Sequence, residues 1–252
     1  MIILLLLIAL APGFFLAWYF YHRDKYEPEP KLKIVKIFLL GALMVVPAAL
    51  GEALVINVFK VNTQGLLNII VLSFLIIAPI EELLKYVAVR KWIYNSLEFD
   101  EIMDGIVYTV SASLGFATAE NVIYVLPLGI QTGILRAFLT VPGHALFGAI
   151  MGYYIGRAKF NREKETSLII KGIALALLCH GLYDFLALSR SIFSSLVIFL
   201  LGVLVLWIRR QLKLVEVASR HRLANMKNTN PEPTVSDVYD TDEAQDSAID
   251  TP

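Results

Sequence analysis

The sequence predicts an all-α, polytopic membrane protein with about seven transmembrane helices and a polar site between helices. Of the 252 residues, 57% are hydrophobic and only 17% are charged, and the mean hydropathy is +0.66. Such a chain has too little polar surface for an ordinary soluble domain. Apolar runs of membrane length recur at residues 2–20, 34–57, 66–88, 104–127, 134–157, 168–188 and 192–208.

The links between these runs alternate in charge. Lysine and arginine gather after the first, third, fifth and seventh runs, whereas the links after the second and sixth runs carry only Lys60 and Arg190, and the fourth link carries none. By the positive-inside rule, this pattern predicts a multi-pass protein of the cytoplasmic (inner) membrane, with its N-terminus outside and its C-terminus in the cytoplasm. No basic residue precedes the first run, so we expect a retained span and not a cleavable signal peptide.

Composition divides the chain into three parts. Residues 1–208 are the predicted transmembrane core, 209–224 a basic cytoplasmic juxtamembrane segment, and 225–252 an acidic tail that is expected to be disordered. The net charge of zero hides this asymmetry, which does not favour nucleic-acid binding. The single cysteine, Cys179, excludes an internal disulfide.

Three glycines repeat at every fourth position in the fifth run. Gly148, Gly152 and Gly156 have the spacing that allows two helix backbones to approach closely in a membrane. We therefore interpret them as packing residues and not as part of a site.

Ionisable groups inside the apolar runs mark the candidate site, because a carboxylate in hydrocarbon costs several kcal/mol and needs a polar partner. Four different runs contribute the residues Glu81, Glu82 and Lys85; Phe116, Glu120 and Asn121; His144; and His180 and Asp184. On a helix Lys85 lies within reach of Glu81 and Glu82, so we expect one glutamate to pair with it and the other to face a different partner. Asp184 is four residues after His180 and is expected to accept a hydrogen bond from its ring.

These residue types suit the hydrolysis of an amide bond. One glutamate would take a proton from the attacking water, a general-base role that burial favours. His144 and His180 would donate hydrogen bonds to the developing oxyanion or protonate the leaving amine. The residue pattern does not distinguish which of the two glutamates is the base.

The same residues carry a resemblance to a known family. The motifs are Glu81-Glu82-Leu83-Leu84-Lys85, Asp104-Gly105-Ile106-Val107-Tyr108, Gly115-Phe116-Ala117-Thr118-Ala119-Glu120-Asn121, Pro142-Gly143-His144-Ala145-Leu146-Phe147 and His180-Gly181-Leu182-Tyr183-Asp184. Together with the connector Tyr26 to Lys31, they resemble the PrsW family of intramembrane proteases, which is related to the type II CAAX prenyl proteases.

The resemblance implies a glutamate-dependent endopeptidase that needs no cofactor. Glu81 and Glu82 would be the catalytic acids, Glu120, His144 and His180 would complete the site, and Asp184 would support His180. The implied partner is a single-span membrane protein in the lipid bilayer, such as an anti-sigma factor that receives its first cut on the extracytoplasmic side.

Three other functions are compatible with the sequence. In the first, His144, His180 and Glu82 hold zinc, although the sequence has no His-Glu-x-x-His motif. In the second, the polar groups form a path through a transporter, with a broken helix at Ala78-Pro79. In the third, the protein is a non-catalytic membrane scaffold.

Overall fold

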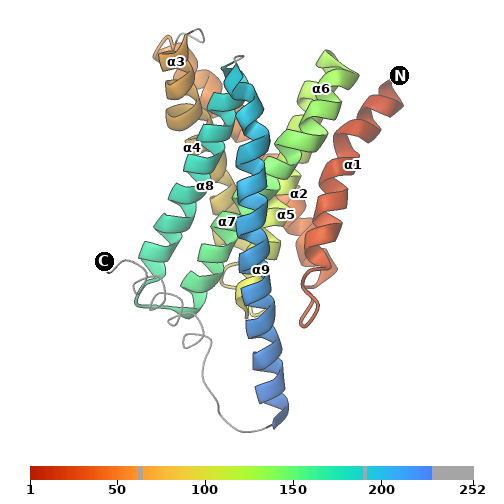
Figure 1. Cartoon of the computed structure of the whole chain (residues 1–252), viewed down its shortest axis with the longest axis vertical. Coiled ribbons are helices and arrows are strands. Elements are labelled where there is room, and N and C mark those ends of the chain that lie inside the picture. Colours follow the sequence, from red (N-terminus) through yellow and green to blue (C-terminus); the bar gives the residue numbers. More distant parts are fainter. Residues whose placement is uncertain (62–64, 190–191, 229–252) are drawn as a thin grey trace.

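The computed structural model describes residues 1–61, 65–189 and 192–228, and every regular element within them is helical (Figure 1). The helices run side by side as a bundle, and α9 extends beyond its lower end. The elements are α1 (Ile2–Tyr21), α2 (Lys31–Val58), α3 (Leu66–Val71), the π-helix η1 (Leu72–Ile77), α4 (Ala78–Trp92), α5 (Ile102–Leu128), α6 (Ile130–Leu135), the π-helix η2 (Arg136–Thr140), α7 (Val141–Phe160), α8 (Glu165–Leu188), the short 3₁₀-helix η3 (Ile192–Ser195) and α9 (Leu196–Asn228).

Six helical stretches among the described residues are long and apolar enough to cross a membrane. They are Ile2–Tyr21, Lys31–Val58, Leu66–Trp92, Ile102–Leu128, Ile130–Phe160 and Glu165–Leu188. Each contains one of the first six predicted runs, so the prediction of an all-helical multi-pass membrane protein is confirmed. Their outward side chains are apolar: Leu43, Val46 and Leu50 on α2 are 61%, 60% and 67% exposed, as expected for a lipid-facing surface.

The seventh predicted run, 192–208, forms η3 and the beginning of α9. The apolar part of α9 before Arg209 covers only about 20 Å at 1.5 Å per residue, so it is shorter than the other six stretches. The helix then continues through the predicted basic segment to Asn228. The remainder of the predicted disordered tail, 229–252, lies outside the described residues.

Helix α5 is the centre of the bundle. Nearly all residues of its apolar stretch are buried, and α1, α2, α4 and α7 all pack against it. Glycines make these contacts close: a Cβ atom on Gly115 would lie 1.8 Å from the Phe38 carbonyl oxygen of α2, and one on Gly152 would lie 2.3 Å from the Gly105 carbonyl oxygen. The three glycines of α7 therefore serve packing, as predicted, and they bring α5 and α7 into backbone contact.

The first turn of α5 is fixed by its own acid. Asp104 Oδ2 accepts hydrogen bonds from the backbone N–H groups of Asp100 and Glu101, each at 2.7 Å. These donors stand at the start of the helix, where no carbonyl group is available to them within the helix. Asp104 therefore caps the start of α5.

The contact between α5 and α7 should not tolerate a methyl group. We expect Gly152→Ala to destabilise the protein by about 1–3 kcal/mol, because the new Cβ would meet the backbone of Gly105 and Ile106, which cannot rotate away. The matched control is Gly202→Ala on α9, where a Cβ has no atom within 4 Å and alanine should stabilise the helix slightly. Thermal unfolding of the purified variants measures both effects, and equal stability of Gly152→Ala and wild type would contradict this packing.

Candidate functional site

Two helices change their winding just before the residues of the site. The π-helix η1 leads into α4, which carries Pro79 in its first turn, and η2 leads into α7, which carries Pro142 in the same place. The proline ring would clash with the carbonyl four residues earlier in a regular α-helix, and the wider π-helical turn before it makes room for the ring. The helix at Ala78-Pro79 is therefore continuous and not broken, which corrects the feature expected for a transporter.

Lys85 joins both glutamates of α4. Its ammonium group is fully buried and donates hydrogen bonds to Glu81 Oε2 at 3.0 Å and to Glu82 Oε1 at 2.8 Å. The third partner is His144 Nδ1, at 2.9 Å. An ammonium group has three protons, so Lys85 is completely satisfied. The expectation that only one glutamate pairs with Lys85 is wrong, because helical spacing brings both carboxylates to the same nitrogen.

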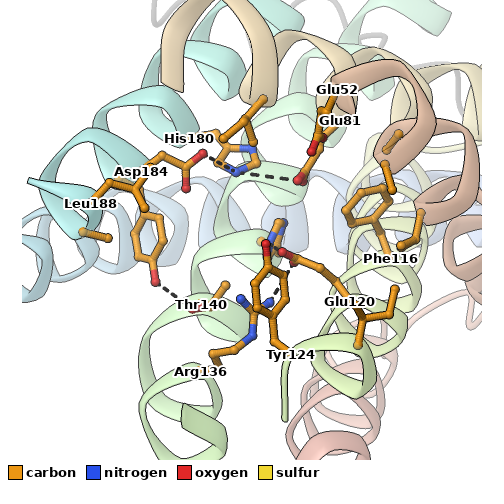
Figure 2. Close-up of a pocket in the computed structure, with 18 residues that line it drawn as sticks. Glu52, Glu81, Phe116, Glu120, Tyr124, Arg136, Thr140, His180, Asp184 and Leu188 are labelled. Atoms are coloured by element: carbon orange, nitrogen blue, oxygen red, sulfur yellow. Dashed lines mark hydrogen bonds and ion pairs between the residues drawn. The ribbon is translucent and has the colours of Figure 1, made fainter. Parts of the chain in front are cut away.

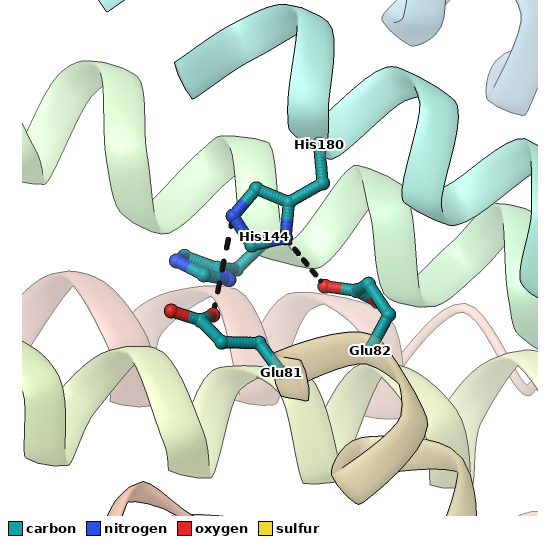
Figure 3. Close-up of side chains that lie close together, drawn as sticks. All are labelled: Glu81, Glu82, His144 and His180. Carbon is teal, nitrogen blue, oxygen red and sulfur yellow. Dashed lines mark hydrogen bonds and ion pairs between the residues drawn. The ribbon is translucent and has the colours of Figure 1, made fainter. Parts of the chain in front are cut away.

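His180 of α8 lies against the two glutamates (Figure 3). Its Nδ1 atom is 2.8 Å from Glu82 Oε1, and its Nε2 atom is 3.9 Å from Glu81 Oε2. Asp184 Oδ2 lies 3.5 Å from Nε2 and has no hydrogen-bond partner. The hydrogen bond that orients the ring therefore goes to Glu82, whereas the sequence predicted Asp184 in this role.

His144 of α7 connects Lys85 to Glu120 of α5. Its Nδ1 atom accepts a hydrogen bond from the Lys85 ammonium, so a neutral His144 carries its own proton on Nε2. That nitrogen lies 3.2 Å from Glu120 Oε2. The ring is 2% exposed, so these contacts form away from lipid and bulk water.

Arg136 is a functional candidate that the sequence interpretation missed. Its Nη2 atom lies 2.8 Å from Glu120 Oε2, and its Nε donates to Asn121 Oδ1 at 2.6 Å. Asn121 in turn donates to the Ala9 carbonyl of α1, at 3.2 Å. A charged residue within the apolar run 134–157 was the available signal, since arginine inside a span needs a partner.

Aromatic rings surround the charged groups. The Lys85 nitrogen lies 4.3 Å from the centroid of Phe116, one helical turn before Glu120. Phe147 stacks on His180 with ring centroids 5.0 Å apart and planes 17° apart. These rings exclude lipid and lower the local dielectric, which strengthens the polar contacts.

A cavity of about 280 Å³ opens beside this cluster (Figure 2). Glu81, Glu120, His144 and His180 all line it, whereas Glu82 is 0% exposed and lies behind them. The remaining polar lining residues are Glu52, Tyr124, Arg136, Thr140, Tyr183 and Asp184. The two adjacent glutamates thus have different surroundings, with Glu81 at the cavity and Glu82 in the protein interior.

The donor set fits zinc by chemical type and spacing. Glu81, Glu82, His144 and His180 each offer a ligand atom, and these atoms lie within 4.8 Å of one another. Histidine nitrogens and carboxylate oxygens are common zinc ligands. In the arrangement described, however, the Lys85 ammonium already binds one atom of Glu81, of Glu82 and of His144.

Comparisons with known proteins agree on one family. A model described as "PrsW family intramembrane metalloprotease" matches residues 29–209, a range that contains all the site residues named above. No solved structure matches the chain.

Curated relatives are named as PrsW proteases. The protein named "Protease PrsW" of Geobacillus kaustophilus is 41% identical over 181 residues, which is 71% of this chain and 78% of the relative. That of Bacillus subtilis is 39% identical over 193 residues, or 74% and 85% of the two chains. That of Clostridioides difficile is 32% identical over 211 residues, or 81% and 87%.

Removal of the Lys85 charge should weaken the fold. We expect Lys85→Met to cost about 3–5 kcal/mol, because two buried carboxylates would lose their shared cation. The additional substitution Glu82→Gln should recover part of this loss, since it removes one of the uncompensated charges. Lys36→Met, at an exposed position of α2, is the control. Unfolding curves in detergent provide the measurement, and an unchanged stability of Lys85→Met would show that the ammonium is dispensable.

Proposed function

Because the chain belongs to the PrsW family of intramembrane proteases, we propose that it cleaves membrane-spanning proteins with a water molecule that Glu81 activates. Family membership makes the protein a multi-pass membrane enzyme that acts on protein substrates, so the scaffold and transporter alternatives are not retained. The observation that carries the mechanism is the position of Glu81 at a polar cavity, with His144 and His180 beside it.

Glu81 is the better candidate for the general base. A base must reach water, and of the two glutamates only Glu81 lines the cavity. Glu82 is enclosed by Lys85 and His180 and holds both in place. In the proposed step the water oxygen attacks the peptide carbonyl carbon, Glu81 takes the released proton, and this proton then passes to the leaving amine.

The histidines supply hydrogen bonds to the reacting group. His144 carries its proton on Nε2, the nitrogen that faces Glu120 beside the cavity, and this N–H can donate to the developing oxyanion. His180, held by Glu82 through Nδ1, can pass a proton through Nε2. Glu120 and Arg136 form an ion pair at the cavity and would position His144 and the substrate backbone.

The cavity lies toward one end of the bundle. Leu188, the last residue of α8, lines it, as does Glu52, which is about 9 Å from the end of α2 at 1.5 Å per residue. The N-terminus lies at this end in Figure 1, the end predicted to be extracytoplasmic. This supports cleavage of a single-span protein on its outer side, as in the first cut of an anti-sigma factor.

Zinc-dependent hydrolysis is the second candidate, favoured by the compact donor set and by the description of the family model. His144, His180 and Glu82 would hold the metal, which would activate water as a Lewis acid. The contacts of Lys85 favour the metal-free version, because an ammonium group already provides a positive charge among these donors.

The glutamate mechanism can be tested by a substitution that removes the carboxylate but keeps the size of the side chain. In vesicles that contain a single-span substrate, Glu81→Gln should lower the cleavage rate by roughly 100-fold or more, the range for loss of a general base. Glu163→Gln, in an exposed turn, should cleave at the wild-type rate. The amount of product per unit time is measured by gel. Cleavage by Glu81→Gln at the wild-type rate would disprove the proposed role.

The effect of metal removal on cleavage distinguishes the glutamate mechanism from the zinc mechanism. Protein freed of metal by a chelator, with its zinc content measured by mass spectrometry, should retain full cleavage activity because Lys85 supplies the charge that zinc would supply. Loss of activity on chelation, with recovery after addition of stoichiometric zinc, would favour the zinc mechanism. Lys85→Met provides the contrast, since it should remain inactive whether or not zinc is added.

A further inference from the structure

A second cluster of buried carboxylates lies at the opposite end of the bundle from the cavity. Asp24 follows α1, Glu29 belongs to the connector before α2, and Asp104 stands in the first turn of α5. Their exposed fractions are 4%, 4% and 1%. Each offers one oxygen atom, and these oxygens lie within 4.8 Å of one another.

The protein satisfies only part of this cluster. The Tyr108 hydroxyl donates a hydrogen bond to Glu29 Oε2, and two backbone N–H groups donate hydrogen bonds to Asp104 Oδ2. Asp24 Oδ2 and Asp104 Oδ1 are shielded from solvent and have no hydrogen-bond partner. Buried polar atoms without a protein partner are rare and are usually satisfied by an ordered water molecule or a bound ion.

Basic side chains near the cluster are bound elsewhere. Arg23 and Lys25 form ion pairs with Glu216 of α9, at 3.3 and 3.2 Å. Arg222 lies 3.2 Å from Asp100 and 3.6 Å from Glu27. Within the described part of the chain, no lysine or arginine forms an ion pair with Asp24, Glu29 or Asp104.

The cluster is therefore electrostatically unfavourable by itself. Three carboxylates are buried side by side, and no lysine or arginine of the described residues forms an ion pair with them, so their negative charges repel one another. A cation placed among these oxygens would remove the repulsion and give the free oxygen atoms a ligand.

We propose that Asp24, Glu29 and Asp104 bind a divalent cation that prefers oxygen ligands, Mg²⁺ or Ca²⁺. The described cluster contains no histidine or cysteine, which favours these hard cations over zinc. Metal–oxygen distances of about 2.0–2.6 Å match oxygens that are at most 4.8 Å apart. Because the ligands come from three segments, the ion would tie the end of α1 and the connector to the start of α5.

The test is the thermal unfolding of the full chain in detergent, first with a chelator and then with added MgCl₂ or CaCl₂. Sodium chloride at equal ionic strength serves as the reference. One of the two cations should raise the midpoint of wild type by roughly 5 °C at a concentration well above its dissociation constant. Asp24→Asn and Glu29→Gln should abolish the rise, and each should be at least as stable as wild type in chelator.

Two matched variants separate this cluster from other acidic groups. Asp100→Asn removes a neighbouring acid that is not a proposed ligand, and Glu81→Gln alters the protease site, so both should keep the cation-dependent rise. The proposal is overturned if neither cation raises the wild-type midpoint above the sodium reference. It is also overturned if Asp24→Asn and Glu29→Gln show the same rise as wild type, because the cluster would then hold protons alone.

Discussion

The hydrogen bonds of Lys85 are the interaction on which the rest of the site depends. Two adjacent carboxylates inside a membrane-spanning helix repel each other and have lost their contact with water. The buried ammonium compensates both, and its third proton reaches His144 on a different helix. One side chain thus fixes the direction of both glutamates and the tautomer of a histidine, which are requirements for proton transfer in a fixed geometry.

The packing of α5 makes this arrangement possible. Glycines at its contacts with α2 and α7 remove the side chains that would otherwise separate the backbones. Because the helices approach so closely, Glu120 on α5 reaches His144 on α7, and the charged groups are enclosed by protein and not by lipid. The same helix carries Asp104 at its opposite end, so α5 connects the protease cavity to the second carboxylate cluster.

Hydropathy and charge predicted the first six spans and the residues that meet between four helices, because an ionisable group in an apolar run has few alternatives to a polar interior. The partners within that interior were harder to predict. Glu82 replaces Asp184 as the hydrogen-bond partner of His180, and this depends on how α4 and α8 are rotated against each other. Asp24 and Glu29 lie in a segment without helical periodicity, so no spacing rule connects them to Asp104. The catalytic roles remain predictions.

The two π-helical segments, η1 and η2, limit which insertions and deletions the protein can tolerate. Each contains a turn that is wider than an α-helical turn, so the residues before and after it are out of phase with a regular helix. None of the residues of α3 is buried, whereas α4 turns Glu81, Glu82 and Lys85 inward. Loss of one residue from such a segment would rotate one half of the helix by about 100° relative to the other. The length of these segments is therefore constrained by the chemistry of the site as well as by the thickness of the membrane.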